Sequence, residues 1–183
     1  MKERHFMKAT GIVRRIDDLG RIVVPKEIRR TLRLREGDPM EIYTGRDGVV
    51  MLKKYSPLHD MSVLSDSYVK IVHNLLGKPT FLCDKDQILA VAGASKGIYE
   101  GRTISAYLEQ QIAQRQFVQH DEPADIEIKL NDELQTKGYM IAPINVNGDV
   151  IGALVLAAIE EPLTQQDALV LQSVTAVVEL QYM

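Results

Sequence analysis

The feature that most restricts how this chain can fold is the density of turn signals in residues 8–55. The pattern predicts short elements only: strands at 11–16 and 21–24 around a tight turn at 17–20, a helix at 26–32 that begins after Pro25, and a hairpin of 40–43 with 49–52. Four short strands and one short helix bury too little apolar surface to keep a single chain folded. We therefore expect this part of the chain to intertwine with a second copy of itself.

Beyond Ser56 and Pro57 the pattern changes to longer elements. It predicts a helix at 59–76, a hairpin of 80–83 with 88–92, a helix at 103–115, a strand at 126–130, a hairpin of 139–146 with 150–158, and a final helix capped by Thr164. Strands between two outer helices indicate an α+β domain. We expect a first domain at 7–55, a linker at 56–58 and a second domain at 59–183, with Met1 or Met7 as the native start.

The charge of the chain divides at the same place. Residues 1–55 hold 14 Lys and Arg against 8 Asp and Glu, a net charge of +6. Residues 56–183 hold 8 against 17, a net charge of −9. This split indicates a basic head that meets a polyanion and an acidic body that does not.

Several classes of protein are disfavoured by what the sequence lacks. A single cysteine, Cys83, excludes an internal disulfide and argues against a zinc module, so we expect it to be a core residue of a strand, with a redox switch as the alternative. No apolar run is long enough to cross a membrane, and no secretory signal follows Met1. No catalytic or metal-ligand constellation is evident. We expect a cytoplasmic protein that is not an enzyme and that has no cofactor.

The basic residues of the head are concentrated around the first turn and on the short helix. On this helix, Lys26, Arg30 and Arg33 fall at i, i+4 and i+7 and share one face, and Arg29 lies beside Arg33. Cations this close repel one another unless an anion neutralises them, and DNA phosphate does so with release of counterions. A solvated face that only keeps the protein in solution is the alternative interpretation.

Residues 8–32, KATGIVRRIDDLGRIVVPKEIRRTL, resemble the AbrB-type swapped-hairpin DNA-binding domain of transition-state regulators, and the resemblance extends through 7–55. It implies an intertwined β-barrel dimer that binds double-stranded, A/T-rich DNA through its shape. It also implies DNA contacts at Lys8, Arg14, Arg15, Arg21, Arg29 and Arg30. With its second domain, the whole chain is similar to regulators of endospore-forming bacteria that both activate and repress spore-stage genes and associate with the nucleoid.

The second domain resembles a GAF domain, a small-molecule sensor fold, on residues 143–144 and 148–156 together with the outer helices. The resemblance implies a pocket between the central sheet and residues 93–123. Tyr99, Arg102 and Tyr107 are the candidates for its lining, and the chemistry of the ligand is open. A fold of this kind that has lost its ligand is the alternative.

The apolar stripes of the first and last helices of this domain predict a helical bundle between subunits, and hence a homotetramer carrying two DNA-binding heads. We therefore expect a DNA-binding transcription regulator. An addiction-module antitoxin, which uses a similar head, is the alternative, although residues 59–183 have the pattern of a folded domain rather than a toxin-wrapping tail.

Overall fold

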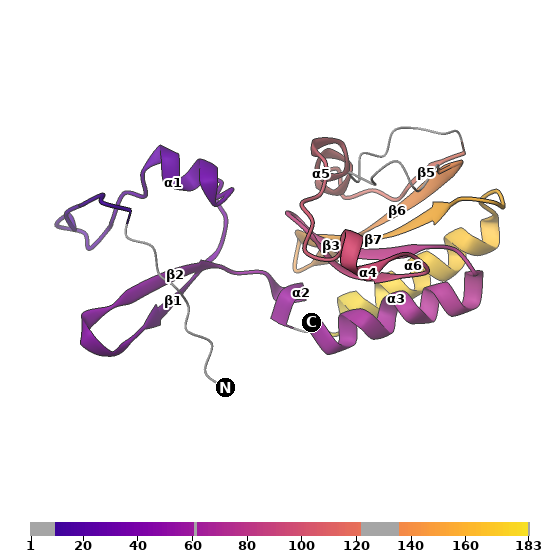
Figure 1. The fold of residues 1–183 in the computed structure, drawn as a ribbon, viewed down its shortest axis with the longest axis horizontal. Coiled ribbons are helices and arrows are strands. Elements are labelled where there is room, and N and C mark those ends of the chain that lie inside the picture. Colours follow the sequence, from indigo (N-terminus) through magenta and orange to yellow (C-terminus); the bar gives the residue numbers. More distant parts are fainter. Residues whose placement is uncertain (1–9, 61, 122–135, 183) are drawn as a thin grey trace. The chain divides into compact units, whose positions relative to one another are not determined.

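The computed structural model describes residues 10–60, 62–121 and 136–182, and the chain divides into two compact units, Met1–Tyr55 and Ser56–Met183 (Figure 1). The described part of the first unit is a helix and a hairpin joined by irregular segments, whereas the second unit is a sheet covered by helices.

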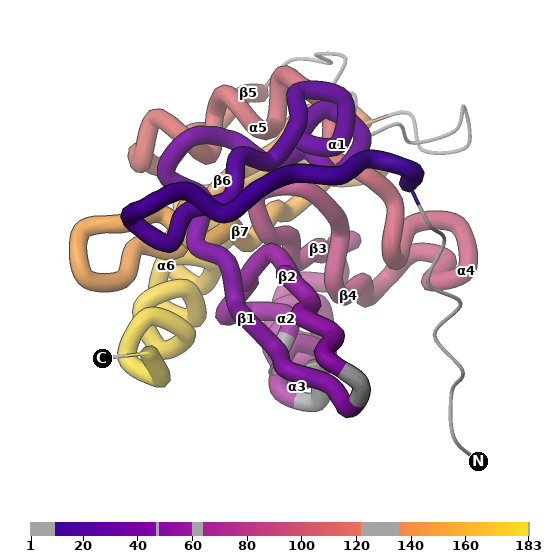
Figure 2. Tube along the Cα trace, turned by 90° about the vertical axis from the view of Figure 1, so that its left-hand side faces the viewer, coloured from indigo at the N-terminus to yellow at the C-terminus, as the bar shows by residue number. Residues whose placement is uncertain are grey.

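In the first unit, helix α1 spans Lys26–Thr31, and strands β1 (Met40–Thr44) and β2 (Val50–Lys54) pair antiparallel. A single turn of 3-10 helix, η1 (Arg46–Gly48), joins the two strands, which lie side by side in Figure 2. The helix and this hairpin were predicted from the sequence, and both are confirmed.

The two strands predicted at 11–16 and 21–24 are wrong for the single chain, because neither segment has strand structure. The turn between them is present: the Asp17 amide donates to the Arg21 carbonyl (3.0 Å) and the Gly20 amide donates to the Asp17 carbonyl (3.0 Å). Gly20 has φ +75°, a backbone conformation that suits glycine. A strand needs a neighbour for its amides and carbonyls, and the described residues of this unit offer these segments none.

Helix α1 ends sooner than the sequence pattern implied. The Leu34 amide donates to the Arg29 carbonyl (2.8 Å) and the Arg33 amide to the Arg30 carbonyl (3.4 Å), which is the Schellman arrangement of a helix end. Arg33 lies beyond the helix with φ 52°. The prediction that Lys26, Arg30 and Arg33 share one helical face is therefore wrong for Arg33, which is not part of the helix.

The second unit is built on a five-stranded antiparallel sheet with the strand order β4-β3-β7-β6-β5. Its strands are β3 (Thr80–Asp84), β4 (Ile88–Ala92), β5 (Val118–His120), β6 (Gly138–Val146) and β7 (Asp149–Ala158). Both predicted hairpins are confirmed as β3–β4 and β6–β7. The sequence pattern missed β5, and the strand predicted at 126–130 lies outside the described residues.

In the described part of this unit, five helices accompany the sheet: α2 (Pro57–Asp60), α3 (Ser62–Leu76), α4 (Lys96–Tyr99), α5 (Ala106–Ala113) and α6 (Gln165–Leu180). Thr164 caps α6 as predicted, in a capping box with Asp167. Helix α5 begins later than predicted because Ser105 is its N-cap and accepts from the Leu108 amide (3.0 Å). Helix α2 takes up two of the three residues expected to form a linker.

Helices cover both faces of the sheet (Figure 1). Beneath α3 and α6, a core of buried side chains includes Val69, Leu82, Leu154 and Leu171. Against α4 and α5, a second core includes Phe81, Leu108 and Ile141. The inner strands β3, β6 and β7 are consequently buried almost continuously along their length, as expected of strands covered on both faces.

Leu58 of helix α2 belongs to the core beneath α3 and α6 and is 1% exposed. A Cβ atom at Gly152 of β7 would lie 2.5 Å from Leu58 Cδ1 and 2.2 Å from the Cys83 carbonyl oxygen. Glycine is therefore required at this position, and its missing side chain is what lets α2 pack against the sheet.

Candidate nucleic-acid interface

The cations predicted to bind DNA lie around the turn and on helix α1. Arg14 and Arg15 precede the turn, Arg21 closes it, and Arg29 and Arg30 lie in the last turn of α1. All five side chains are exposed to solvent. Lys8 lies outside the described residues.

The five arginines differ in their partners. Arg21 Nε donates to Asp17 Oδ2 at 2.8 Å, and Arg14 Nη1 donates to the Val13 carbonyl at 3.1 Å. Within the described part of the chain, Arg15, Arg29 and Arg30 have no acidic partner closer than the 4.0 Å of an ion pair. Their full charge is therefore directed at solvent, where an anionic ligand can reach it.

The carboxyl of Asp17 has a lowered pKa. The largest cause is the hydrogen bond from the Arg21 backbone amide, and the Arg21 guanidinium lowers the pKa further. Asp17 is consequently ionised throughout the neutral range, and the turn carries a fixed negative charge beside its arginine.

A second ion pair neutralises the charge of Lys54, which is therefore less available to an anionic ligand. Lys54 Nζ lies 2.9 Å from Asp38 Oδ2 and donates to the Arg33 carbonyl at 3.3 Å, and the Arg35 amide donates to the same Asp38 oxygen at 2.8 Å. These contacts attach the loop after α1 to strand β2. Sequence reasoning missed this clamp, because it depends on the pairing of residues far apart in the chain.

No side chain among the described residues of the first unit is buried. Large apolar side chains stay in contact with water, including Val13 at 85% exposure, Val23 at 72% and Ile42 at 65%. Monomeric soluble proteins rarely leave a unit of this kind uncovered. The first unit thus has the arginines of an interface for a polyanion and the apolar surface of an interface for protein.

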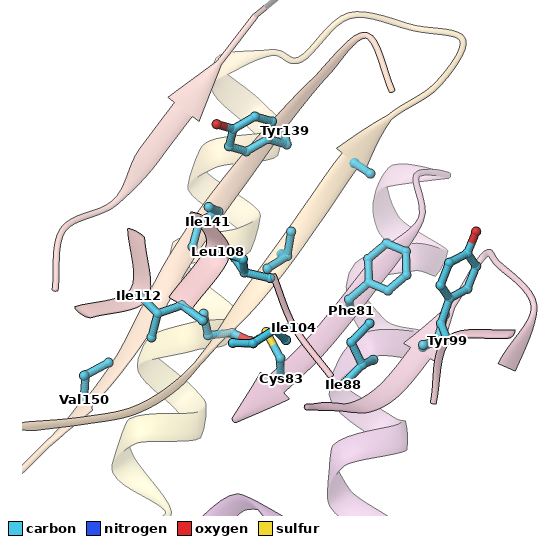
Figure 3. Packing of buried hydrophobic residues seen from close by; sticks show 14 residues of the cluster. Phe81, Cys83, Ile88, Tyr99, Ile104, Leu108, Ile112, Tyr139, Ile141 and Val150 are labelled. Atoms are coloured by element: carbon cyan, nitrogen blue, oxygen red, sulfur yellow. The ribbon is translucent and has the colours of Figure 1, made fainter. Parts of the chain in front are cut away.

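In the second unit, the three residues predicted to line a sensor pocket have different surroundings, although the Arg102 amide donates to the Tyr99 carbonyl (3.0 Å). Tyr99 is 1% exposed and packs edge-to-face on Phe81, with ring centroids 5.5 Å apart. Figure 3 shows this pair at one end of the buried cluster and Tyr139 at the other. Arg102 is exposed, and its Nε donates to the Ile98 carbonyl at 3.1 Å.

Tyr107 lies with Tyr139, at the end of the cluster away from Tyr99. The hydroxyls of Tyr107 and Tyr139 are 2.5 Å apart, and the His120 ring stacks on Tyr139 with a centroid distance of 4.8 Å. Burial raises the pKa of Tyr139, and the hydrogen bond with Tyr107 adds to the rise. Sequence reasoning missed Tyr139 and His120 because the signal that joins them is the pairing of β5 with β6.

On this face, the described side chains of α4 and α5 pack against the sheet in an apolar cluster. A cavity of about 180 Å³ lies elsewhere, between Leu58, Ser65, Leu89 and Gly101. Cys83 is buried in β3, as predicted, and burial raises the pKa of its thiol far above the usual range, which disfavours the reactive thiolate. The described residues contain no cluster of His, Cys, Asp and Glu fit for a metal ion. None of their helices is long and apolar enough to cross a membrane.

Two protein families match parts of the chain. Residues 60–178 match "Stage V sporulation protein T C-terminal, transcription factor", and residues 13–58 match "Antidote-toxin recognition MazE, bacterial antitoxin". Among individual proteins, stage V sporulation protein T of Bacillus subtilis (strain 168) is 47% identical over 150 residues, which cover 82% of this chain and 84% of that protein. The transition state regulatory protein AbrB of the same organism is 58% identical over 52 residues, covering 28% of this chain and 53% of that protein.

A solved structure has the fold of the second unit. The GAF domain from Acinetobacter phosphoenolpyruvate-protein phosphotransferase matches with a TM-score of 0.56 at 15% identity, over 69% of this chain and 82% of that one. The α+β class and the GAF-like architecture expected from the sequence are confirmed.

Proposed function

The chain belongs to the stage V sporulation protein T family, whose members are transcription factors, and from this premise we propose that it is a DNA-binding regulator of spore-stage genes. In this proposal it activates some genes and represses others. The first unit contacts double-stranded DNA as an intertwined dimer, and the second unit assembles the heads and receives a signal. The regulator acts in the cytoplasm, on the nucleoid.

The observation that carries the proposal is the surface of the first unit, on which exposed arginines occur together with uncovered apolar side chains. A second copy that supplied strands to residues 11–16 and 21–24 would satisfy their backbone groups and bury Val13, Val23 and Ile42. It would also double the number of arginines on one surface. DNA affinity rises with the number of phosphates that cations neutralise, so dimerisation and DNA binding support each other.

The way this surface would read DNA follows from its residue types. Residues 1–55 contain no Asn and no Gln, the side chains best suited to adenine edges. Arginines can instead enter the narrow minor groove of A/T-rich tracts, whose negative potential attracts them. We therefore propose recognition of A/T-rich DNA by shape, with modest discrimination and steep dependence on salt.

The test is a set of single substitutions in the full chain, each assayed by DNA binding across a salt series. Arg14→Ala, Arg21→Ala, Arg29→Ala and Arg30→Ala should each weaken binding by about tenfold, and the variants of Arg14, Arg29 and Arg30 should also flatten the salt slope by about one. Lys8→Ala and Arg15→Ala should act mainly on the salt slope, as phosphate contacts do. Arg46→Ala, which removes the same charge from η1, is the matched control and should change binding less. If the first four variants bind like wild type, the proposal is wrong.

The match of residues 13–58 to an antitoxin family favours a second candidate, an addiction-module antitoxin. An antitoxin has a segment that folds around its toxin, whereas the second unit of this chain already has two buried cores. Co-expression with the product of an adjacent gene discriminates between the two. A stable complex that blocks a toxic activity would favour the antitoxin, and independent behaviour favours the regulator.

For the second unit we propose assembly into a homotetramer through α3 and α6. Apolar side chains on these helices remain exposed, among them Leu64, Ile71, Leu75, Leu169 and Leu180. Light scattering on the intact chain and on residues 1–55 should give a tetramer and a dimer. The same oligomer for both would refute this assembly.

A ligand inserted beside Tyr99 would have to displace packed side chains of the apolar cluster. We propose that any sensing starts at the Tyr107 and Tyr139 end, where the His120 side chain is exposed to solvent. Native mass spectrometry of protein from sporulating cells tests this, with a Tyr107→Phe variant as the comparison. A copurified small molecule that this variant loses would support sensing, and the absence of any ligand would leave the unit with its assembly role alone.

A further inference from the structure

The carboxylate of Asp17 makes three hydrogen bonds within its own turn. Its Oδ1 accepts from the Leu19 amide (3.0 Å) and the Arg21 amide (2.8 Å), and its Oδ2 accepts from Arg21 Nε (2.8 Å). The first two bonds fix the carboxylate to the backbone. The third therefore holds the guanidinium of Arg21 on a fixed support rather than on another free side chain.

The backbone of the turn is fixed as well. The Asp17 amide donates to the Arg21 carbonyl, the Gly20 amide donates to the Asp17 carbonyl, and Gly20 adopts its left-handed conformation. An exposed ion pair contributes little to stability, since solvent screens it and two side chains lose freedom. In this turn one of the two side chains is already immobile, so the pair acts chiefly on the position of Arg21.

The consequence for Arg21 is chemical as well as geometric. Asp17 occupies the Nε–H donor, so the guanidinium can bind a ligand only through its two Nη groups, which form a planar fork. The adjacent carboxylate also repels phosphate oxygens. A paired arginine is therefore a poorer counterion for the DNA backbone, and a better oriented donor to uncharged acceptors on the floor of a groove.

Arg15, Arg29 and Arg30 differ in this respect, because within the described residues none of them has a carboxylate beside it. Their charges are suited to phosphates of any sequence. Arg21 therefore differs from these three arginines of the first unit, because it alone among them is paired with a carboxylate.

We propose that Asp17 is a positioning residue that makes Arg21 a groove-reading contact rather than a phosphate contact. Through Arg21, Asp17 thereby sets how strongly the protein discriminates between DNA sequences. This inference rests on the proposed DNA-binding function, and it attributes the discrimination to the pair of Asp17 and Arg21.

The experiment compares Asp17→Asn with Asp18→Asn in the full chain. An Asn at position 17 keeps an oxygen for the Leu19 and Arg21 amides, so the turn persists, but it presents no charge to Arg21. Asp18 is exposed, and within the described residues its side chain makes no hydrogen bond or ion pair, so its substitution changes the net charge equally without touching Arg21.

The measured quantity is the ratio of affinities for an A/T-rich and a G/C-rich duplex of equal length, over a salt series. Asp18→Asn should strengthen binding to both duplexes and leave the ratio unchanged. Asp17→Asn should strengthen binding to the G/C-rich duplex, steepen its salt slope, and lower the ratio by about tenfold, the loss of one good groove contact.

Two further variants separate positioning from a merely structural role. Arg21→Lys keeps the charge but lacks the Nε–H and the planar fork, and it should lower the ratio as Asp17→Asn does. In an Arg21→Ala background, Asp17→Asn should do no more than Asp18→Asn. If Asp17→Asn and Asp18→Asn give equal ratios in the wild-type background, the inference is wrong. If wild-type protein binds neither duplex, the proposed function fails instead.

Discussion

In the second unit, helices on both faces of a five-stranded sheet enclose two apolar cores. In the first unit, a hairpin, a short helix and a turn leave every described side chain at least partly in water. The two units therefore differ in what keeps them folded. The second unit encloses its own apolar interior, whereas the described side chains of the first unit enclose none.

The largest expected effect is on the interior of the second unit. Phe81 in β3 is fully buried against Tyr99, so Phe81→Ala should lower the free energy of unfolding by about 3–5 kcal/mol. Urea unfolding of the full chain, followed by the transition of the second unit, measures it. Phe81→Leu keeps most of the volume and should lose no more than about 1.5 kcal/mol. A loss below about 1 kcal/mol for Phe81→Ala would contradict a self-sufficient core.

The next effect concerns the ion pair that fastens α6 to the start of the sheet. Lys78 Nζ lies 3.2 Å from Asp167 Oδ2, with the two side chains 11% and 4% exposed. Lys78→Met leaves a buried carboxylate without its cation and should cost about 3 kcal/mol. Lys70→Met is the matched control, because the Lys70 pair with Asp66 is exposed and should be worth less than about 0.5 kcal/mol. Equal losses for the two variants would place Lys78 in solvent.

The third effect tests whether the first unit is covered by a second copy. Ile42 in β1 is 65% exposed in the single chain, so Ile42→Ala would be nearly neutral there. If a partner covers this surface, the variant should lose about 2 kcal/mol, and its melting temperature should depend on protein concentration. Lys53→Ala on β2 controls for general effects on the hairpin. A neutral Ile42→Ala with melting independent of concentration would mean that the first unit is monomeric.

How well the sequence predicts the structure also differs between the units. The hairpins β3–β4 and β6–β7 and the Thr164 cap were predicted because apolar alternation, turn residues and capping residues are local signals. The strand β5 was missed because only three residues pair, and their partner lies far along the chain. The segments 11–16 and 21–24 have the sequence pattern of strands, but no described segment of the same chain pairs with them, so the pattern and the single-chain structure disagree there.

The residues of the candidate DNA site could be predicted from the sequence, but the contacts between their side chains could not. Composition shows that basic residues gather in the first unit, and the resemblance to the AbrB-type domain implies which of them contact DNA. The structure places Arg14, Arg15, Arg21, Arg29 and Arg30 on the exposed surface. The hydrogen bond from Arg21 to Asp17 and the ion pair of Lys54 with Asp38 depend on side-chain geometry, which the hydrophobic periodicity of the sequence does not encode. For the sensor face, residue type alone could not distinguish Tyr99, which fills a core, from Tyr107, which lies at its edge.

A smaller effect compares two arginines in the left-handed backbone region, Arg33 with φ 52° in the first unit and Arg115 with φ 60° in the second. Glycine relieves this strain by about 1 kcal/mol. Arg33→Gly should therefore stabilise the first unit by about that amount, because within the described residues its side chain has no hydrogen bond or ion pair. Arg115→Gly should be close to neutral, because it also loses the contacts of Arg115 with the Gly148 carbonyl and Asp149. Thermal melts of both variants test the contrast, and a destabilised Arg33→Gly would show that the Arg33 side chain packs in the assembled protein.

The smallest effect is the response of the first unit to acid. Burial raises the pKa of Asp38, but the hydrogen bond from the Arg35 amide and the ammonium of Lys54 outweigh it, so the pKa lies below its usual 3.8. A carboxyl with a lower pKa in the folded state stabilises the fold when ionised. That contribution is fully present above the unfolded value and is lost as the pH falls through the folded value.

The first unit should therefore lose stability as the pH falls below about 4, by less than about 1 kcal/mol for a group this close to the surface. Asp38→Asn should remove this part of the pH dependence in melts recorded between neutral and acid pH. Asp66 in the second unit also has a lowered pKa, chiefly through its hydrogen bond from Lys96, but its side chain is 37% exposed against 9% for Asp38. Asp66→Asn should consequently change the acid response less than Asp38→Asn does. The opposite order would mean that the contacts of Asp38 with Lys54 and with the Arg35 amide do not hold the loop between α1 and β1 against β2.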